Sequence, residues 1–321
     1  MAPLVSRSLE GCSPHATTAI SRKPSIAAKA VRRERNGGCV GYLRAAQRLA
    51  NARGRESRKD APLFVDLFAE LLCDVRKDDT EKSPSTIEAQ DVIATQYLDE
   101  CLMQAVSLTN ESRGDYRQVV LLGPGLDTRP FRLPWPAGTV IYSVAPAELN
   151  KLAIDKIGQE TMRASLPKGC IHIPVDVDFT NQDGGGLMDG FAKTPFQGDK
   201  PSVWDLQGMS DVGLSQSDWA NLFAEIGCLA SFQSLISGEL PESATFQLLA
   251  ESGFLGAIVE YGDPEANYNR WPFPAGSKDS QSLGVLFSAQ HQRLSLKEME
   301  TYEAHVTAAE ETDEDFFGNF S

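Results

Sequence analysis

The stretch QVVLLGPGLDTRPFRLPWP, residues 118–136, decides the fold of this chain. Its apolar run at 119–122 begins with two valines and has the length of a buried central strand. Glycines at 123 and 125 end the strand, and the polar sequence Asp-Thr-Arg follows at 127–129. The carboxyl end of a strand is where α/β sheets bind ligands, and glycine lets a ligand approach the backbone closely. The stretch therefore predicts a ligand site at the turn after the first strand.

Strand and helix patterns alternate after this first strand. The strand candidates are residues 118–122, 139–144, 170–175, 201–206, 232–237, 255–260 and 283–289. Amphipathic helices fit between the early strands, but only the Pro- and Gly-containing connection 262–280 separates the last two, which indicates an antiparallel pair. The sequence predicts an α/β fold with a doubly wound, mostly parallel, seven-stranded sheet. Class I methyltransferases have such a sheet, and dinucleotide-binding folds share its first half.

Helical patterns precede the first strand. One amphipathic segment lies at 60–72, where the apolar face consists of Phe64, Leu67, Phe68, Leu71 and Leu72. A second begins with Ser85 and Glu88 at the spacing of a capping box. We expect two or three helices within residues 41–107, and we expect them to cover the ligand site as an N-terminal helical cap.

The overall composition limits the classes of protein to which the chain belongs. It has 321 residues, of which 41% are hydrophobic and 23% charged, as in soluble globular proteins. Its formal net charge of −14 argues against a general nucleic-acid-binding surface. No apolar run approaches the roughly 18 residues that a membrane-spanning helix needs. The six cysteines and four histidines are scattered, which predicts neither a disulfide framework nor a metal site. The sequence does not indicate an oligomeric state.

The two ends of the chain differ in charge. Residues 1–33 contain six Lys or Arg residues and one acid, Glu10, and are rich in Ser, Ala and Thr. This composition resembles that of an organelle transit peptide, and a disordered N-terminus is the alternative interpretation. We therefore predict a leader at 1–36, a folded domain at 37–307 and an acidic tail at 308–321. The expected location is the chloroplast, with the mitochondrion or cytoplasm as alternatives.

The residues of the glycine turn distinguish two nucleotide cofactors. The dinucleotide fingerprint G-x-G-x-x-G needs a third glycine for close helix packing, but Thr128 occupies that position. Asp127 adds a negative charge where a pyrophosphate needs free N–H groups. An acid there suits a cofactor that carries an ammonium and a sulfonium. The chemistry favours S-adenosylmethionine over NAD.

The longer string VVLLGPGLDTRPFRLPWP closely resembles the signature LGAGLDTRxxRLxWP of the leucine carboxyl methyltransferase and polyketide-type O-methyltransferase family. Further matches follow in order along the chain. ARGRESRKDAPLFVDLFAELL is similar to the family's N-terminal RAxES and LFxDPxA elements, IPVDVD to its third strand, PSVWDLQGM to its fourth, and GELP follows the fifth. The resemblance implies the class I fold, S-adenosylmethionine as cofactor, and methyl transfer to a carboxylate or hydroxyl oxygen of a small molecule or protein terminus.

The resemblance also implies a set of cofactor-binding residues. These are Gly123, Pro124, Gly125, Asp127, Thr128, Arg129, Ser143, Ala145, Asp176, Val177, Gln207 and Gly208. The glycine turn would surround the methionine end of the cofactor, and Asp176 would accept a hydrogen bond from the adenine amino group. A solvated strand end or a metal pair is the alternative for Asp176. Surface solubility is the alternative for Arg129 and Arg132, and Trp135 is expected to shape a turn.

Several charged positions of the family pattern hold neutral residues here. In the family, the two acids of the second-strand ExD element hold the ribose hydroxyls. Here Ser143 and Ala145 replace these acids. Gln207 replaces the family's glutamate after the fourth strand. Ala94 replaces the arginine that is expected to pair with the cofactor carboxylate. Glu148 lies beyond the strand end and is a weak substitute. A hydrogen bond to a charged group contributes about 1.5–3 kcal/mol, so these losses would weaken cofactor binding substantially.

Two functional hypotheses follow from these departures. The first is an active S-adenosylmethionine-dependent O-methyltransferase, which works mainly by aligning an oxygen nucleophile with the methyl group. The second is a catalytically weak or inactive binding protein with the methyltransferase fold. The sequence contains no visible Ser/His/Asp or Cys/His arrangement, so it predicts no catalytic residue. It does not identify the methyl acceptor.

Overall fold

The computed structural model describes residues 37–72, 85–108, 114–158, 165–180, 185–241, 246–273 and 284–305. The chain divides into two units, Met1–Asn36 and Gly37–Ser321, and all described residues belong to the second. The expected leader at 1–36 and acidic tail at 308–321 lie outside the described residues, so both stay predictions.

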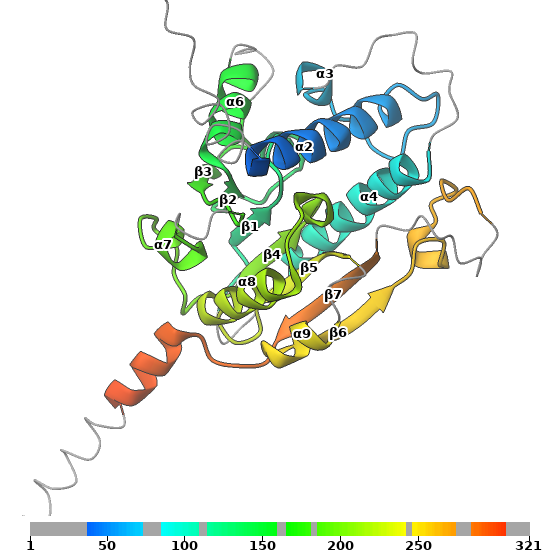
Figure 1. Ribbon diagram of the computed structural model, residues 1–321. Coiled ribbons are helices and arrows are strands. Elements are labelled where there is room, and N and C mark those ends of the chain that lie inside the picture. The colour runs from blue at the N-terminus through cyan, green and yellow to red at the C-terminus, as the bar shows by residue number, and fades with distance from the viewer. Residues whose placement is uncertain are drawn as a thin grey trace, which may run out of the picture. The chain divides into compact units, whose positions relative to one another are not determined.

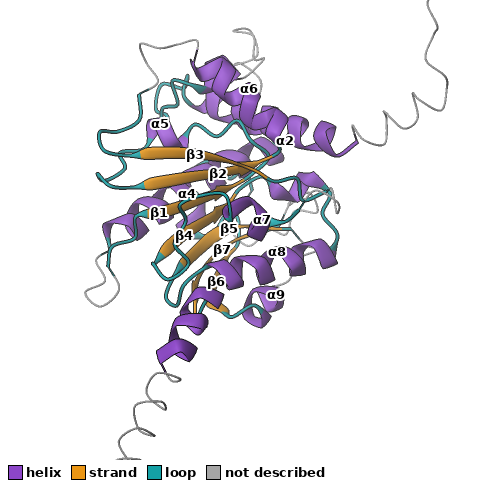
Figure 2. Cartoon of the chain, turned by 90° about the vertical axis from the view of Figure 1, so that its left-hand side faces the viewer, coloured by secondary structure: helices purple, strands orange, loops and turns teal. Residues whose placement is uncertain are grey.

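The core of the fold is a seven-stranded sheet with the strand order β3-β2-β1-β4-β5-β7-β6 from one edge of the sheet to the other (Figure 2). Its strands are β1 (Gln118–Leu122), β2 (Val140–Ala145), β3 (Ile171–Asp176), β4 (Ser202–Leu206), β5 (Leu235–Leu240), β6 (Phe254–Val259) and β7 (Val285–His291). The strands β1 to β5 pair in parallel, and β7 is antiparallel to both β5 and β6. The prediction of a doubly wound, mostly parallel sheet of the class I methyltransferase type is confirmed.

Helices connect and cover these strands. They are α2 (Gly37–Glu56), α3 (Ala69–Leu72), α4 (Thr86–Ser107), α5 (Arg129–Arg132), α6 (Ala147–Gly158), α7 (Leu187–Phe191), α8 (Gln216–Leu229) and α9 (Phe246–Glu251), with the short 3₁₀ turns η2 (Met209–Val212) and η3 (Pro264–Ala266). Helices α2 and α4 pack against each other, as Figure 1 shows in blue and cyan. No helix in the described part of the chain is both long and apolar enough to span a membrane.

The central strand β1 is buried along its whole length because both of its faces are covered. Val120 and Leu122 pack in one hydrophobic cluster with side chains of α7 and α8. Val119 and Leu121 point to the other face and pack in a second cluster with α4. This two-sided burial explains the continuous apolar run that marked the strand in the sequence.

The prediction of a helix at 60–72 is wrong for most of this range, because only Ala69–Leu72 is helical. The carboxylate of Asp66 accepts hydrogen bonds from the backbone N–H groups of Phe68 and Ala69, each at 3.0 Å, so the helix begins there. Leu67, which the helical pattern assigned to the buried face, is 63% exposed. Ser85 caps the next helix as expected, since its hydroxyl accepts from the Glu88 N–H at 3.2 Å, while the Glu88 carboxylate accepts from Arg55 at 2.8 Å.

Candidate functional site

The turn after β1 is built around a glycine that no other residue could replace without strain. Gly125 has a φ of +99°, and a Cβ added to it would lie 2.9 Å from the Cβ of Leu149 on α6. Gly123 stays attached to the sheet, since its N–H donates to the carbonyl of Val144 at 3.3 Å. The turn therefore leaves β1 sharply and places its backbone beside the start of α6.

A cavity with about 620 Å³ of empty space, including space open to solvent, lies against this turn. It is lined by these predicted site residues: Gly123, Pro124, Gly125, Asp127, Arg129, Ser143, Ala145 and Gln207. Strand register explains why residues far apart in the sequence meet here. Leu121 lies opposite Ser143 on β2 and Asp205 on β4, and Ser143 lies opposite Pro174 on β3, so these side chains form one row on one face of the sheet.

Two of the predicted residues have structural contacts outside this cavity. Thr128 is fully buried, and its hydroxyl donates to a carboxylate oxygen of Asp66 at 2.6 Å. Gly208 has a φ of +72°, and its N–H donates to the carboxylate of Glu239 at 2.7 Å. Both residues hold neighbouring segments in place and do not line the cavity.

The residues expected beside the adenine also lie outside the cavity lining. Asp176 is exposed at the end of β3, where its carboxylate accepts from the side-chain amide of Asn150 at 2.8 Å. The same amide donates to the carbonyls of Ala145 and Val175, so Asn150 ties the ends of β2 and β3 to α6. Val177 is buried in the main hydrophobic core. A direct contact between Asp176 and a cofactor stays a prediction.

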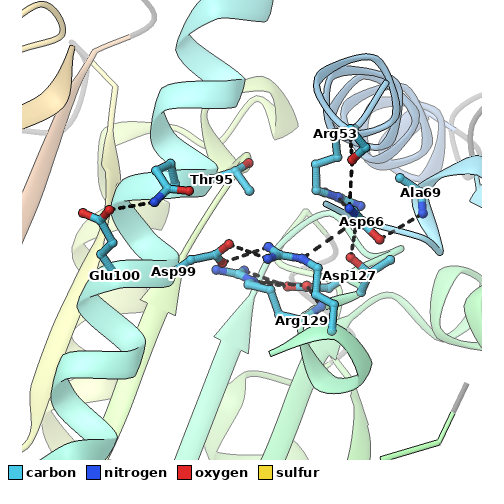
Figure 3. Close-up of polar contacts among 12 residues, drawn as sticks. Arg53, Asp66, Ala69, Thr95, Asp99, Glu100, Asp127 and Arg129 are labelled. Atoms are coloured by element: carbon cyan, nitrogen blue, oxygen red, sulfur yellow. Dashed lines mark hydrogen bonds and ion pairs between the residues drawn. The ribbon is translucent and has the colours of Figure 1, made fainter. Parts of the chain in front are cut away.

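A buried charge network anchors the turn to the sheet (Figure 3). Two guanidinium nitrogens of Arg129 donate to Asp127, with distances of 2.9 and 2.7 Å to Oδ2, and a third pairs with Asp205 on β4. Burial opposes ionisation of Asp127, but Arg129 outweighs it and holds the pKa of Asp127 below its usual range. Burial raises the pKa of Asp205 to about 6 despite the same guanidinium. The charge of Asp127 is therefore already balanced by the protein.

Arg132 belongs to the same buried layer. Its guanidinium binds both carboxylate oxygens of Asp99 on α4, at 2.8 Å for Oδ1, and lies 5.5 Å from the ring centroid of Phe64. The side chains of Arg129 and Arg132 are only 3% and 6% exposed. Surface solubility is therefore the wrong interpretation of both arginines, which connect α5 to the sheet and to α4.

Helix α2 roofs the cavity with two residues that sequence reasoning did not select, Leu49 and Arg53. Arg53 is buried, and it donates through Nε to Asp66 at 3.0 Å and through Nη2 to the carbonyl of Leu126 at 2.9 Å. Its Nη1 has no hydrogen-bond partner among the described residues. The position of Arg53 in the RAxES-like element was the available signal for its role.

The β2–β3 end of the cavity contains a polar pair that the sequence did not reveal. His172 on β3 and Ser143 on β2 lie with Nε2 and Oγ 2.9 Å apart. The ring of Phe131 meets the imidazole edge-to-face, with centroids 5.5 Å apart and an angle of 80°. Burial lowers the pKa of His172, and Asp127 opposes this only in part. The pairing depends on the register of β3 against β2, which sequence reasoning did not fix.

The neutral replacements leave little negative charge around the cavity. Gln207 donates to the Thr95 hydroxyl at 2.8 Å, and Ala94 is fully buried in a hydrophobic cluster that includes Tyr261. Glu148 is exposed on α6 and does not line the cavity. Asp127 is the one carboxylate among the described lining residues. Within the described ranges, no group of three His, Cys, Asp or Glu side chains could hold a metal ion.

A second charge cluster, in which only Asp91 is fully buried, joins α2, α4 and η2. Asp91 forms an ion pair with Arg48, whose other terminal nitrogen lies 2.9 Å from Asp211. The Oδ2 atom of Asp91 is buried and has no hydrogen-bond partner in the described structure. Burial raises the pKa of Asp91 to about 8, although Arg48 opposes the shift. The cluster holds the N-terminal helices together near Gln207.

Comparison with known proteins adds sequence relatives to this geometry. The family model described as leucine carboxyl methyltransferase matches residues 46–226. The chain is 29% identical over 297 residues to O-methyltransferase 1, chloroplastic, of Oryza sativa subsp. japonica, covering 86% of this chain and 78% of the relative. It is 28% identical over 190 residues to a Mycolicibacterium gilvum protein described as a candidate S-adenosyl-L-methionine-dependent methyltransferase, covering 59% of this chain and 71% of that protein.

Among solved structures, a DUF574 family protein from Streptomyces avermitilis superposes with a TM-score of 0.48 at 10% sequence identity. The superposition covers 77% of this chain and 97% of that protein.

Proposed function

Because the chain belongs to the leucine carboxyl methyltransferase family, we propose that it is an S-adenosylmethionine-dependent O-methyltransferase. The acceptor would be a carboxylate or hydroxyl oxygen of a small molecule or protein terminus. The observation that carries this proposal is the cavity at the glycine turn after β1, roofed by α2 and floored by β1, β2 and β3. The family match begins within α2 and ends within α8, so it includes both the roof and the floor.

The polar and apolar side chains of the cavity match the polar and apolar parts of the proposed cofactor. Gln207 follows β4, and Arg53 on α2 binds the turn after β1, where its Nη1, which has no partner among the described residues, suits a carboxylate. Asp127 is the one acid among the described lining residues, and its carboxylate is the nearest negative charge for an ammonium although Arg129 already pairs with it. The β2–β3 end is walled mainly by apolar side chains, including Phe131, Ile154 and Pro174, which suits a nucleoside.

The proposed reaction requires alignment more than activation. When bound, S-adenosylmethionine supplies a methyl group that is already activated by its sulfonium. The residues of this chain then have to hold the cofactor in one orientation and bring an oxygen nucleophile in line with the methyl carbon. A carboxylate acceptor needs no general base, whereas a hydroxyl acceptor gains from one. We assign no side chain to that role.

One observation favours a second candidate function, a weak or inactive binding protein with the same fold. The cavity has no carboxylate on β2, and its one acid, Asp127, is already paired with Arg129. The cofactor would therefore meet fewer charge-assisted hydrogen bonds than the family pattern provides. A lower affinity for the cofactor would follow even if the methyl transfer itself is preserved.

Calorimetric titration of the full chain with S-adenosylmethionine and S-adenosylhomocysteine tests the proposal. Saturable binding of both ligands is the expected result, and no binding of either would overturn it. A turnover assay that follows release of S-adenosylhomocysteine then separates the two candidates. Activity with a carboxylate or hydroxyl acceptor supports the enzyme, whereas tight binding without turnover across such acceptors supports the binding protein.

We also propose that the protein acts in the chloroplast after removal of its leader. The basic, acid-poor composition of residues 1–36 and the chloroplastic name of the rice relative support this location. Fluorescence of a fusion that carries residues 1–36 ahead of a reporter tests it. Plastid fluorescence is expected, and mitochondrial or cytoplasmic fluorescence would contradict the proposal.

A further inference from the structure

The two edge strands of the sheet differ in how their free backbone groups are protected. At the β3 edge, Ile171 and Val177 donate their N–H groups toward β2, so the alternation of the strand turns Pro174 outward. Proline has no N–H, so another strand cannot pair with this edge without a gap. The opposite edge strand, β6 (yellow in Figure 1), contains neither proline nor a charged residue within Phe254–Val259.

The middle of β6 is open to solvent. Its four central residues, 255–258, are all exposed, whereas the first and last residues of the strand are buried. Leu255 and Ile258 are 59% and 49% exposed. An exposed, uncharged edge strand is a template for pairing with a further strand, and natural proteins usually protect such an edge or pair it.

The register of β6 against β7 shows which backbone groups are free. The N–H of Gln292 donates to the carbonyl of Gly253 at 2.8 Å, and the pairing continues in the same register along the strand. In an antiparallel pair, every second residue directs its N–H and C=O to the neighbouring strand. The backbone groups of the exposed residues Gly256 and Ile258 therefore point away from β7, toward the free edge.

We propose that β6 pairs antiparallel with β6 of a second copy of this chain, around a two-fold axis at Ala257. Gly256 of each copy then lies opposite Ile258 of the other, and every outward N–H and C=O of these two residues gains a partner. The same strand serves on both sides of the axis, so the contact closes as a dimer.

The neighbouring registers pair these groups less well. A shift in one direction would place Ile258 opposite Phe254, which is fully buried. A shift in the other direction would place Gly256 opposite Glu260, whose N–H already donates to Asp263 at 3.0 Å. The axis at Ala257 is therefore the register that uses the exposed part of the strand alone.

The side chains are also self-complementary in this register. The exposed Ile258 lies beside Gly256, which has no side chain that could obstruct it. On the other face of the sheet, Leu255 lies opposite Val259, and Ala257 lies opposite its own copy. Each of the exposed apolar residues thereby gains an apolar or small neighbour across the new pair.

The charges at the ends of the paired segment are complementary as well. Glu260 lies opposite Phe254 of the other copy, one residue from Gly253. The Arg293 side chain packs there, since a Cβ added to Gly253 would lie 2.7 Å from its Cδ. Glu260 and Arg293 are both exposed, and neither forms an ion pair among the described residues. The pairing brings the acid of one copy to the arginine of the other.

Sedimentation equilibrium of the full chain tests the proposal. The paired segment is short, so the contact is smaller than a standard interface of about 1,600 Å², and we expect a dissociation constant on the order of micromolar. In the strand order, β6 lies at the edge opposite β3, away from the cavity at β1–β3, so the proposal does not depend on methyl transfer.

Ala257→Lys and Ala257→Glu form the decisive pair of variants. Each places two like charges directly opposite each other on the axis and should raise the dissociation constant roughly fivefold or more. A mixture of the two variants places Lys opposite Glu and should restore dimers. Ile258→Pro removes one outward N–H per copy without touching the β7 ladder, and should raise the dissociation constant about tenfold or more.

Met299→Lys is the matched control. Met299 is 41% exposed on the C-terminal helix at 296–305, another exposed apolar site of the described chain, and its substitution should leave the dimer unchanged. Circular dichroism verifies that each variant is folded. A wild type that stays monomeric up to about 100 µM would overturn the inference. So would a dimer that both Ala257 variants retain, or one that dissociates with Met299→Lys alone.

Discussion

Replacement of Asp127 by asparagine tests whether this acid is mainly a structural partner of Arg129. Asparagine keeps the shape of the side chain but removes its charge. In the wild type, the carboxylate accepts from the backbone N–H of Arg129 at 2.9 Å and from two of its guanidinium nitrogens. Arg129 is 2% exposed, so the variant would leave a buried guanidinium with Asp205 as its remaining carboxylate partner.

The expected loss is about 3 kcal/mol in the free energy of unfolding near pH 7. Removing one partner of a buried ion pair costs about 3–5 kcal/mol, and the retained contact with Asp205 places this variant at the lower end. Urea denaturation followed by circular dichroism measures the difference. Because the folded-state pKa of Asp127 is lowered, its stabilisation is present above about pH 4 and is lost at lower pH. The gap between wild type and variant should therefore narrow in acid.

Asp205→Asn provides the matched control. In the folded wild type the pKa of Asp205 is raised to about 6, so the wild type loses stability as the pH rises from about 4 to 6. The variant should not show this loss of stability. The cost of Asp205→Asn near pH 7 should accordingly be smaller than that of Asp127→Asn. Equal stability of Asp127→Asn and the wild type at pH 7 would refute the assignment of Asp127 as the main counter-charge of Arg129.

Three other substitutions and one measurement on the natural protein have defined outcomes. Arg53→Met should weaken S-adenosylmethionine binding at least about tenfold in calorimetry, because a charged hydrogen bond is lost. Equal affinity would mean that Arg53 only holds α2 against the turn. Ala145→Asp should raise that affinity by about tenfold by restoring an acid on β2, and no gain would mean that the cofactor does not reach this strand end. The raised pKa of Asp91 should make the wild type lose stability as the pH rises from about 4 to 8, and Asp91→Asn should remove this loss. Urea denaturation at several pH values measures it. If the variant keeps the same loss of stability, other groups cause it. Mass spectrometry of the endogenous protein should find a first residue within 34–42, and an intact Met1 would contradict a cleaved leader.

The sequence identified the strands well where glycine or proline bounded an apolar run. The first strand has both predicted ends, 118–122. The fifth was predicted at 232–237 but begins three residues later, at Leu235. Gln233 adopts a φ of +69° and its N–H donates to the carbonyl of His291, so the chain turns there. A turn formed by glutamine instead of glycine leaves little local signal, because a contact with β7 stabilises it.

The candidate site was predictable only where it is local. The cavity-lining turn follows directly from the glycines after β1, and Ser143 and Ala145 follow from the end of the next strand. His172 joins them through the register of β3, and Arg53 through the packing of α2. Both are tertiary properties that a pattern of single residues does not contain. The pairing of Arg129 with Asp205 was also missed, because Asp205 lies far along the chain.

The contacts of the roof over the cavity have a kinetic consequence. Arg53 links α2 to the carbonyl of Leu126, and Asp66 accepts from both Arg53 and Thr128, all in buried positions. Lifting α2 away from the turn would break both hydrogen bonds of Arg53 together, those to Asp66 and to Leu126. Ile154 on α6, in contrast, lines the cavity while 52% exposed. Ligand exchange is therefore expected past α6, so the width of that opening would set the residence time of the reaction product.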